Sequence, residues 1–506
     1  MQIRKWVFWP VFLLVLASVL FSLCLPEVFV ERMQEVNAWI LHHFDWLFNA
    51  VTAVILIVIL VIRLSWLSEI RIGGEEAVPL FNKWRYFAIT LCTTVAAGIL
   101  FWSTAEPLYH LHDPPPFAHA AASSDAAHVF AMATLFLHWT ITPYGIYTIV
   151  SIMFAIVFYN LKRPFRISSM LYPMLRKAPA ESADNLIDIV CLFALIAGMA
   201  ASLGAGILTV AGGLHTIFGW SQSDLMLGLI ALAVVATFIL SSISGLLRGI
   251  RVLSDLNIRI FFALLLFVLA FGPGFSIWKV GGEAVIHYFV NFIPNAIGHY
   301  QPDDKAWTGS WTVFYWANWM AWAPLTGMFL GRISRGYRVK EVIMVNLVWP
   351  CIFVIFWMII FGGSTLYYDV QSGGALHQLL LDEGPQSVVY SLFAKLPYAE
   401  IVSVLFLGIV FISYVTAADS NTTVMGGLST MGISTEAQES PAIIKIIWGV
   451  FIGILAWIMI TNSGIEGIKI LSTIGGFPIL FLLLLLVASA LKLLMKGKKI
   501  INSSNE

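Results

Sequence analysis

The chain carries little charge. Asp, Glu, Lys and Arg make up 11% of its 506 residues, whereas a soluble globular domain carries about 25%. Apolar residues make up 59%, which excludes a water-soluble fold. Lys and Arg together number 28, as do Asp and Glu, so no basic field attracts the phosphates of a nucleic acid. We therefore expect an integral membrane protein in contact with the lipid bilayer and without a nucleic-acid partner.

Cysteine is also scarce, and nucleotide-binding motifs are missing. The four cysteines lie in or beside apolar runs without CxxC spacing, at Cys24, Cys92, Cys191 and Cys351. This pattern excludes a disulfide framework and a cysteine-based zinc site. The sequence has no GxxxxGK[ST] phosphate-binding loop and no room for a large soluble domain between apolar runs. Transport by this chain would therefore be driven by gradients.

Long apolar runs are abundant. A helix needs about 20 apolar residues to cross a hydrocarbon core of about 30 Å. We predict twelve spans, at residues 6–25, 44–64, 84–105, 127–159, 186–214, 225–247, 258–278, 311–330, 341–366, 399–418, 443–461 and 470–491. No cleavage pattern follows the first run before Pro26, so we expect a retained span and not a signal peptide. Residues 283–300 and 375–396 look like interfacial helices.

The basic residues support this count and give an orientation. With the N-terminus in the cytoplasm, all but five of the 28 Lys and Arg residues fall on the cytoplasmic side, as the positive-inside rule requires. The weakest stretch is the loop at 420–442, which contains no Lys or Arg. We expect a multi-pass protein of the bacterial plasma membrane with both termini in the cytoplasm. The five residues outside are Arg32, Lys279, Lys305, Lys395 and Lys469.

Two predicted spans contain helix-breaking residues at membrane depth. The third includes residues 95–98 (VAAG) and ends at 105–107 (AEP), and the eighth includes 322–327 (WAPLTG). Backbone groups freed there must be satisfied by a cavity, an ion or a substrate. The two spans lie five apart, so they would open two five-helix blocks of opposite orientation, as in transporters with a midplane site. Two ordinary kinks are the alternative.

Aromatic residues gather on the fourth and eighth spans. At about 100° per residue, those of the eighth span share one helix face. Such residues often form belts at the membrane interface, but Trp139, Trp319 and Trp322 lie inside their spans. A quaternary ammonium has no N–H to donate, so aromatic faces are its natural receptor. The candidate binding residues are Tyr109, Trp139, Tyr144, Tyr147, Trp311, Tyr315, Asn318, Trp319 and Trp322.

These residues stand in motifs that resemble the signature of the betaine/choline/carnitine transporter (BCCT) family. The motifs are 311–316 (WTVFYW), 322–324 (WAP) and 327–336 (GMFLGRISRG), with further matches at 105–107, 138–147, 202–204, 254–257 and 418–420. The resemblance implies an all-α membrane fold of the sodium-symporter (LeuT) type, in which twelve helices form a 5+5 inverted repeat after two leading helices. It also implies a homotrimer. The implied segments are 1–83 (leading helices), 84–280 (first repeat), 281–310 (interfacial linker), 311–493 (second repeat) and 494–506 (tail).

The resemblance also implies roles for the candidate residues. The aromatic box would comprise Tyr109, Trp139, Tyr144, Trp319 and Trp322, with Tyr147, Trp311 and Tyr315 along the path or at a peripheral site. Where the family usually has a Trp-Trp pair, this chain has Asn318-Trp319. Asn318 would bond a carboxylate or hydroxyl of the substrate, make room for a bulkier one, or form an interhelical hydrogen bond. The implied function is transport of a quaternary-ammonium compound of the glycine betaine, choline or carnitine type.

The driving ion is left open. Sodium needs several oxygen ligands, and Val95 and Thr416 stand where the family's sodium-site residues would lie, although Ala417 replaces a serine of sodium-coupled relatives. Carnitine antiporters have an arginine where this chain has Asn257. We expect cation-coupled uptake, with sodium as the candidate coupling ion and no other cofactor. Sodium-independent exchange and proton coupling are the alternatives, and His138 would either relay protons or pack.

Several histidines suggest a further class, a membrane metalloenzyme or haem protein. They are His110, His112, His119, His128 and His138. Most of them lie in an expected outside loop and do not face each other across spans. We therefore expect a transporter and not an enzyme.

Overall fold

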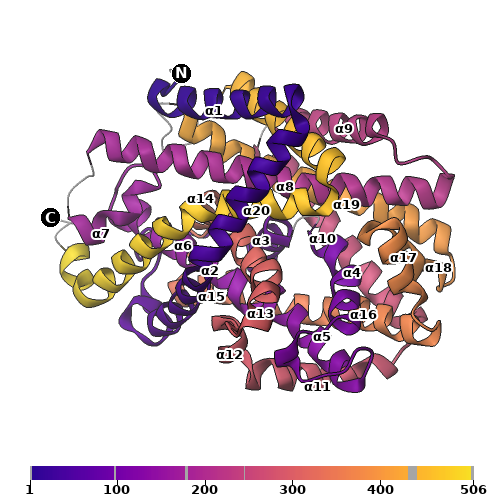
Figure 1. Cartoon of the computed structure of the whole chain (residues 1–506). Helices are drawn as coiled ribbons and strands as arrows, with labels where there is room; N and C mark the ends of the chain where they lie inside the picture. Colours follow the sequence, from indigo (N-terminus) through magenta and orange to yellow (C-terminus); the bar gives the residue numbers. More distant parts are fainter. Residues whose placement is uncertain (1–2, 96–97, 177–179, 244–245, 431–440, 503–506) are drawn as a thin grey trace.

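The computed structural model describes residues 3–95, 98–176, 180–243, 246–430 and 441–502. These residues are helical almost throughout (Figure 1), and their two isolated β-bridges join Ile3 to Thr430 and Arg71 to Arg338. Eight of their helices are long and apolar enough to cross a membrane, or up to ten if each of two bent pairs is one span. The prediction of an all-α multi-pass membrane protein is confirmed.

The helices follow the chain in the order α1 (Lys5–Cys24), α2 (Pro26–Leu64), α3 (Lys83–Val95), α4 (Gly98–His112), α5 (Asp125–Trp139), α6 (Ile141–Ala155), α7 (Tyr172–Leu175), α8 (Glu181–Phe218), α9 (Asp224–Ile243), α10 (Leu246–Phe271), α11 (Ser276–Val290), α12 (Phe292–Ile297), α13 (Pro302–Thr308), α14 (Phe314–Ile333), α15 (Val339–Ile343), α16 (Trp349–Gln371), α17 (Ala375–Glu383), α18 (Val388–Ala394), α19 (Ala399–Ser429) and α20 (Ala442–Asn502). The predicted interfacial segment 283–300 covers the second half of α11 and all of α12, and the segment 375–396 contains α17 and α18.

The predicted spans map onto these helices in order. The long helix α20 contains the last two, with Gly464 at a non-helical φ of 53° between them. The eighth, α14, is not among the eight apolar helices, because its tryptophans and Asn318 lower its mean hydropathy. When α14 is added to the ten, and α20 is divided at Gly464, the twelve predicted spans are recovered.

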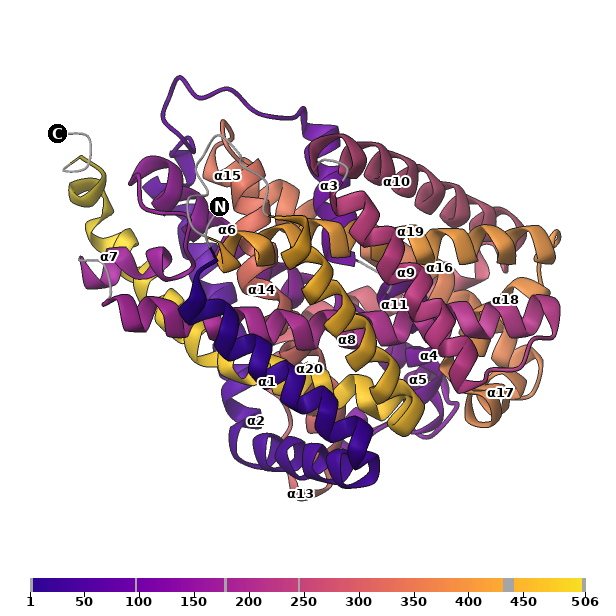
Figure 2. The same ribbon diagram turned by 90° about the horizontal axis from the view of Figure 1, so that it is seen from above.

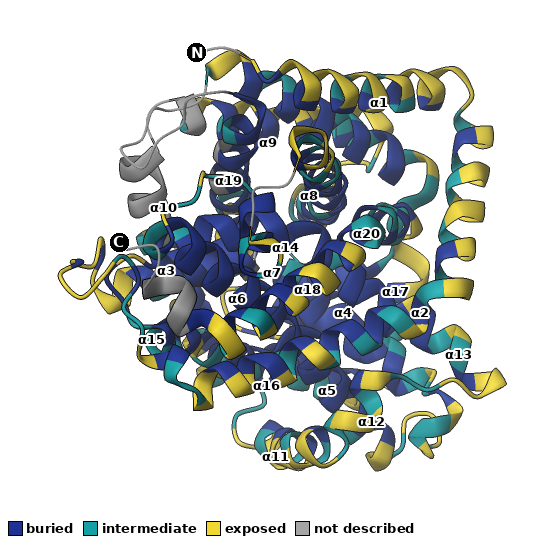
Figure 3. Ribbon diagram, turned by 90° about the vertical axis from the view of Figure 1, so that its left-hand side faces the viewer, coloured by how far each residue is buried: buried dark blue, intermediate teal, exposed yellow. Residues whose placement is uncertain are grey.

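Helix α14 lies in the interior of the molecule (Figures 1 and 2), and nearly all of its side chains are buried. Glycines bring the neighbouring helices close to it, as small residues do between membrane helices. A Cβ on Gly327 would lie 2.4 Å from Val150 of α6, and one on Gly476 of α20 would lie 2.2 Å from the Ala317 carbonyl oxygen. By contrast, α1 and α2 run along the outside with one exposed face (Figure 3), where Trp6 is 75% exposed. That face suits contact with lipid.

The helix breaks only partly follow the prediction. In span three, the axes of α3 and α4 differ by 59°, as a break there predicts, while residues 96–97 lie outside the described part of the chain. The expected break in span eight is wrong, because α14 runs as one helix with Pro324 inside it; the irregular part is a preceding π-helical turn, Gly309–Val313. An unexpected break separates α5 from α6 at Thr140, whose φ and ψ are −118° and −108°.

A buried ion pair fixes the N-terminal segment. Arg4 Nη1 lies 2.6 Å from Asp188 Oδ2 of α8, and their side chains are 8% and 0% exposed. Arg4 also donates to the Leu428 carbonyl and to Asn185 Oδ1, each at 3.0 Å. The start of α1 is thereby attached to α8 and to the end of α19.

Replacing Asp188 by leucine is expected to destabilise the protein strongly. The substitution leaves the Arg4 guanidinium buried without its anion, which costs about 3–5 kcal/mol in such pairs. Thermal unfolding in detergent measures the loss. The Arg4→Met/Asp188→Leu double variant removes both charges and should recover most of the stability. A double variant as unstable as the single one would contradict this account of the pair.

Candidate functional site

Aromatic rings from α5, α6 and α14 meet in the buried core. The ring centres of Trp139 and Trp319 are 5.5 Å apart with an angle of 85° between their planes. Tyr147 lies 5.5 Å and Tyr144 6.2 Å from Trp319, while Tyr315 lies 5.3 Å from Trp139. All five side chains are buried. We call these five residues the aromatic cluster.

The Glu106 carboxylate at the centre of α4 holds two of these rings. Its Oε2 accepts a hydrogen bond from Trp139 Nε1 at 2.9 Å and another from the Tyr315 hydroxyl. Its Oε1 lies 2.6 Å from His138 Nδ1 and 3.4 Å from His110 Nε2. Glu106 and both imidazoles are completely buried. The carboxylate therefore fixes the orientation of Trp139 and Tyr315 through their polar atoms and leaves the ring faces to other contacts.

The break at Thr140 shapes the other side of the cluster. Because α5 ends at Trp139, the carbonyl of His138 is available, and it accepts a hydrogen bond from Trp319 Nε1 at 3.1 Å. Thr140 Oγ1 in turn donates to the Phe136 carbonyl at 2.5 Å. The break at Thr140 thus lies directly after Trp139 of the fourth predicted span and provides the carbonyl that binds the indole of Trp319 from the eighth.

Two predicted residues, Tyr109 and Trp311, form a second ring group beside the cluster. Their ring centres are 5.3 Å apart, and Trp102 lies 5.9 Å from Trp311 and 6.2 Å from Tyr315, joining the two groups. Lys469 Nζ lies 4.7 Å above the Trp311 ring centre. The chain thus places its own ammonium over one of the predicted aromatic faces, which shows that this face accepts a cation.

Asn318 and Trp322 contact other helices. Asn318 Oδ1 accepts a hydrogen bond from Ser472 Oγ of α20 at 3.1 Å, which is the interhelical bond that the sequence left as one of its alternatives. A Cβ on Gly198 of α8 would lie 3.0 Å from the Trp322 indole nitrogen. Of the predicted residues on α14, Tyr315 and Trp319 belong to the aromatic cluster, while the place of Asn318 and Trp322 in the site stays a prediction. The predicted residues of the eighth span spread over an arc of about 100° around the helix axis. Because other helices surround α14, side chains within this arc contact more than one neighbouring helix.

The residues at the expected sodium positions lie on α3 and α19. Thr416 is buried, and its hydroxyl donates to the Ile412 carbonyl of its own helix at 2.8 Å. Val95 is the last residue of α3, and its side chain lies outside the described part of the chain. Asn257, at the position where antiporters have arginine, donates to Ser413 Oγ at 3.0 Å and ties α10 to α19.

The five histidines do not form one site. His110 and His138 share Glu106, whereas His112 pairs with Asp369 at 2.7 Å and His128 contacts the Ser124 carbonyl at 2.8 Å. The arrangement at Glu106 is that of a hydrogen-bonded network. Two ligands of a tetrahedral zinc ion lie roughly 3.3 Å apart, but the His138 and Glu106 atoms are 2.6 Å apart. Although the ligand atoms of Glu106, His110 and His138 lie within 4.8 Å of one another, the distance between His138 and Glu106 is that of a direct hydrogen bond.

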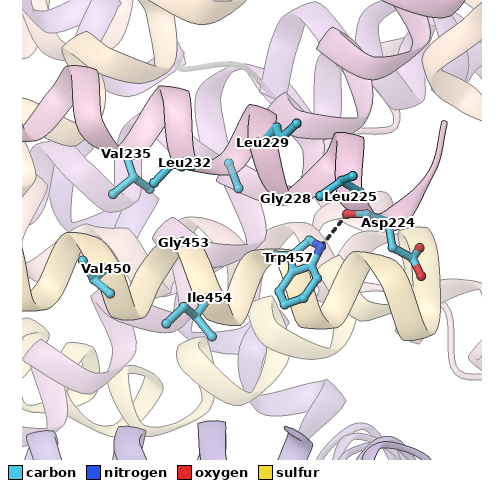
Figure 4. A pocket seen from close by; sticks show the side chains of 11 residues that line it. Asp224, Leu225, Gly228, Leu229, Leu232, Val235, Val450, Gly453, Ile454 and Trp457 are labelled. Atoms are coloured by element: carbon cyan, nitrogen blue, oxygen red, sulfur yellow. Dashed lines mark hydrogen bonds between the residues drawn. The ribbon is translucent and has the colours of Figure 1, made fainter. Parts of the chain in front are cut away.

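A surface groove between α9 and α20 has a different character (Figure 4). It has a volume of about 330 Å³ and is lined mainly by aliphatic side chains, among them Leu225, Leu229 and Ile454. Trp457 Nε1 donates to the Asp224 carbonyl at 2.9 Å. Leu225 and Leu229 are exposed. An open apolar groove of this kind suits lipid chains and offers little to a cation.

Comparison with known proteins agrees with this architecture. Residues 6–499 match the family model described as "BCCT, betaine/carnitine/choline family transporter". The chain belongs to this family. The family that the sequence motifs resemble is thus confirmed, and with it a multi-pass membrane transporter.

Three BCCT relatives match along most of their lengths. The ectoine/hydroxyectoine transporter of Virgibacillus pantothenticus is 29% identical over 97% of both chains. The glycine betaine transporter OpuD of Bacillus subtilis is 28% identical over 99% of this chain and 96% of its own. Glycine betaine transporter 1 of Vibrio parahaemolyticus is 31% identical over 89% and 86%. The solved substrate-bound, outward-open structure of a Na⁺-coupled sialic acid symporter covers 90% of this chain and 97% of its own, with a TM-score of 0.45 and 15% identity.

Sequence reasoning did not assign the Glu106 network to the site. The chain did carry a signal for it, because an acid at membrane depth requires a partner. Glu106 and His110 are also four residues apart on one helix, which places them on the same face. What no spacing predicts is that His138, from another helix, completes the network.

Proposed function

We propose that this BCCT-family protein is a secondary transporter of a quaternary-ammonium compound of the glycine betaine, choline or carnitine type. It works by alternating access, in uptake coupled to a cation gradient. The observation that carries the proposal is the aromatic cluster, in which Trp139 and Trp319 meet almost at right angles in the buried core.

The cluster has the chemistry of a cation receptor. A cation–π contact acts within about 6 Å of a ring centre, and the centres of Trp139 and Trp319 are 5.5 Å apart, so one cation can lie within that reach of both rings. The Glu106 carboxylate behind Trp139 and Tyr315 adds negative charge at hydrogen-bond distance from both rings. A methylated ammonium needs no hydrogen-bond acceptor, so the faces and this charge together suffice to hold it.

The relatives support a small organic solute with a positive centre. Their names give glycine betaine for OpuD of Bacillus subtilis and glycine betaine, proline and choline for a Vibrio parahaemolyticus transporter. The Virgibacillus relative is named for ectoine and hydroxyectoine. Most of these solutes also carry a carboxylate, so a zwitterion such as glycine betaine is the first compound to test.

We also propose the arrangement around this site. Residues 1–83 supply the leading helices, 84–280 and 311–493 form the two inverted repeats, 281–310 link them and 494–506 form the tail. The protein assembles as a homotrimer in the bacterial plasma membrane with both termini in the cytoplasm. Sodium is the proposed coupling ion, and the α3–α4 bend beside Val95, together with Thr416 of α19, is the place where we would seek its site.

Uptake into liposomes tests the proposal. Labelled glycine betaine, choline, carnitine, butyrobetaine and ectoine are offered with and without an inward sodium gradient, and with unlabelled compound preloaded. We expect at least one quaternary-ammonium compound to accumulate when sodium is directed inward. Uptake that requires preloading and ignores sodium would show an exchanger instead. Uptake of ectoine alone, or of none of the compounds, would refute the proposed substrate class.

A further inference from the structure

The Glu106 carboxylate is a charged group that is completely buried in the core of the protein. The carboxylate accepts hydrogen bonds from Trp139 and Tyr315, and with one ring nitrogen each of His138 and His110 at hydrogen-bond distance it has four such contacts. Four acceptor positions correspond to an ionised carboxylate, because a protonated one would give up part of this capacity to its own hydrogen. Glu106 is therefore held as an anion in the core of the protein.

The groups bonded to this anion include no permanent cation among the described residues. Trp139 and Tyr315 donate as neutral groups, so only the imidazoles can supply a positive charge. Lys469 of α20, whose ammonium lies over the Trp311 ring, pairs with Glu466 at 3.2 Å. A buried charge without an opposite charge is unfavourable. The network therefore requires one positive charge, either from a protonated imidazole or from a bound cation.

His138 is the group that can take a proton without losing a contact. Its Nδ1–H points at Glu106, and its Nε2 lies 3.2 Å from the hydroxyl of Thr312. A hydroxyl both donates and accepts, so Thr312 can serve a neutral imidazole as donor or an imidazolium as acceptor. His110 differs, because its Nδ1 has no hydrogen-bond partner among the described residues.

The surroundings of His138 leave this proton one main electrostatic partner. From α4 it faces Glu106 and His110; from α14 it is stacked on Tyr315, with ring centres 4.5 Å apart. The ring centre of Trp307 in α13 lies 6.2 Å from that of His138. Of these, Glu106 alone is a full negative charge. A second cation that approached Glu106 would therefore repel a proton on His138.

We propose that His138 holds a proton when no substrate is bound, and that the cationic headgroup of the substrate displaces this proton when it reaches the aromatic cluster. This inference rests on the proposed function, because it takes the bound solute to be an ammonium. The proton leaves His138 Nε2 for bulk water, the neutral ring keeps its Nδ1–H on Glu106, and Thr312 turns to donate to Nε2. Glu106 thus has one cationic partner at a time, either the imidazolium or the substrate.

The competition has a measurable consequence. Because the proton and the ligand exclude each other, the dissociation constant for glycine betaine should fall as the pH rises, by up to tenfold for each pH unit. Binding should also release up to one proton, which calorimetry detects when the same titration is repeated in buffers of different ionisation heat. Choline serves as a second probe, because neither its methylated ammonium nor its hydroxyl titrates in this range.

The variant that isolates the effect is His138→Asn. The asparagine amide can still donate to Glu106 in place of Nδ1–H, but it cannot be protonated. We expect its affinity for glycine betaine to be independent of pH and its binding to release no proton. The matched control is His128→Asn on the same helix, whose ring nitrogen lies 2.8 Å from the Ser124 carbonyl oxygen, and it should behave like the native protein.

The outcomes separate this inference from the proposed function. If glycine betaine or choline binds without proton release and with no pH dependence, the proton site is refuted while the function stands. If glycine betaine, choline, carnitine and butyrobetaine all fail to bind, the proposed function fails, and the proton is then sought by titrating the tryptophan emission of the full chain between about pH 5 and 8. A transition present in the native protein and His128→Asn but absent in His138→Asn supports the site, and a flat native titration overturns it.

Discussion

A Trp319→Leu variant is expected to lose substrate binding while the protein remains folded. Trp319 contacts Trp139, Tyr144 and Tyr147 at ring-centre distances of 5.5–6.2 Å, so its removal opens the cluster on three sides. A desolvated cation–π contact contributes about 2 kcal/mol, and its loss weakens binding at least about 30-fold. Calorimetry or filter binding with glycine betaine measures the change, and uptake into liposomes should fall with it.

The choice of leucine separates ring chemistry from packing. Alanine at this position would leave a large cavity and cost about 3–5 kcal/mol of stability, whereas leucine fills part of the space without offering a π face. Trp319→Phe keeps a face and gives up the hydrogen bond to the His138 carbonyl, so it should retain more affinity than leucine. Trp349→Ala is the control, because that ring is half exposed at the start of α16. A folded leucine variant with native affinity would refute the cation–π account.

Hydropathy predicted the spans well because each must bury about 20 apolar residues in lipid. It did not predict that α2 begins at Pro26, well before its span, or that α20 continues past Gly464. Nothing in a hydropathy pattern says whether a helix ends at the membrane surface. The break at Thr140 did leave a signal: Pro143 removes an N–H and crowds the carbonyl four residues earlier, at Trp139.

The candidate site could be predicted only where a residue's chemistry limits its surroundings. Trp139 and Trp319 lie too deep in their spans for an interface belt, and the structure brings them together. Asn318 and Trp322 were predicted to join the same site because they lie on the same face of a regular helix as Trp319. Because α14 is covered on nearly all sides, that geometry gives the direction of a side chain but not the helix it meets. The hydrogen-bond partners of Glu106 could not be predicted, because they come from three different helices, α4, α5 and α14.

A Gly476→Ala variant is expected not to assemble into a stable protein. The added Cβ would lie 2.2 Å from the Ala317 carbonyl oxygen and 2.6 Å from its carbonyl carbon and Cα. These are backbone atoms inside a continuous helix and cannot rotate away. Overpacking in a core typically costs 1–3 kcal/mol and occasionally more, and a clash of backbone with backbone falls at about 3 kcal/mol or above. The yield of monodisperse protein and its thermal unfolding in detergent measure the effect.

Gly408→Ala in α19 provides the matched control, because a Cβ there meets no atom within 4 Å. It should be as stable as the native protein, or slightly more so, since alanine favours a helix over glycine by about 1 kcal/mol. The comparison also bears on the site, because Asn318 and Trp319 directly follow Ala317. A shift of α14 away from α20 would break the Asn318–Ser472 hydrogen bond and carry Trp319 with it. A Gly476→Ala protein that folds and binds substrate normally would therefore contradict both the close α14–α20 contact and the dependence of the aromatic cluster on it.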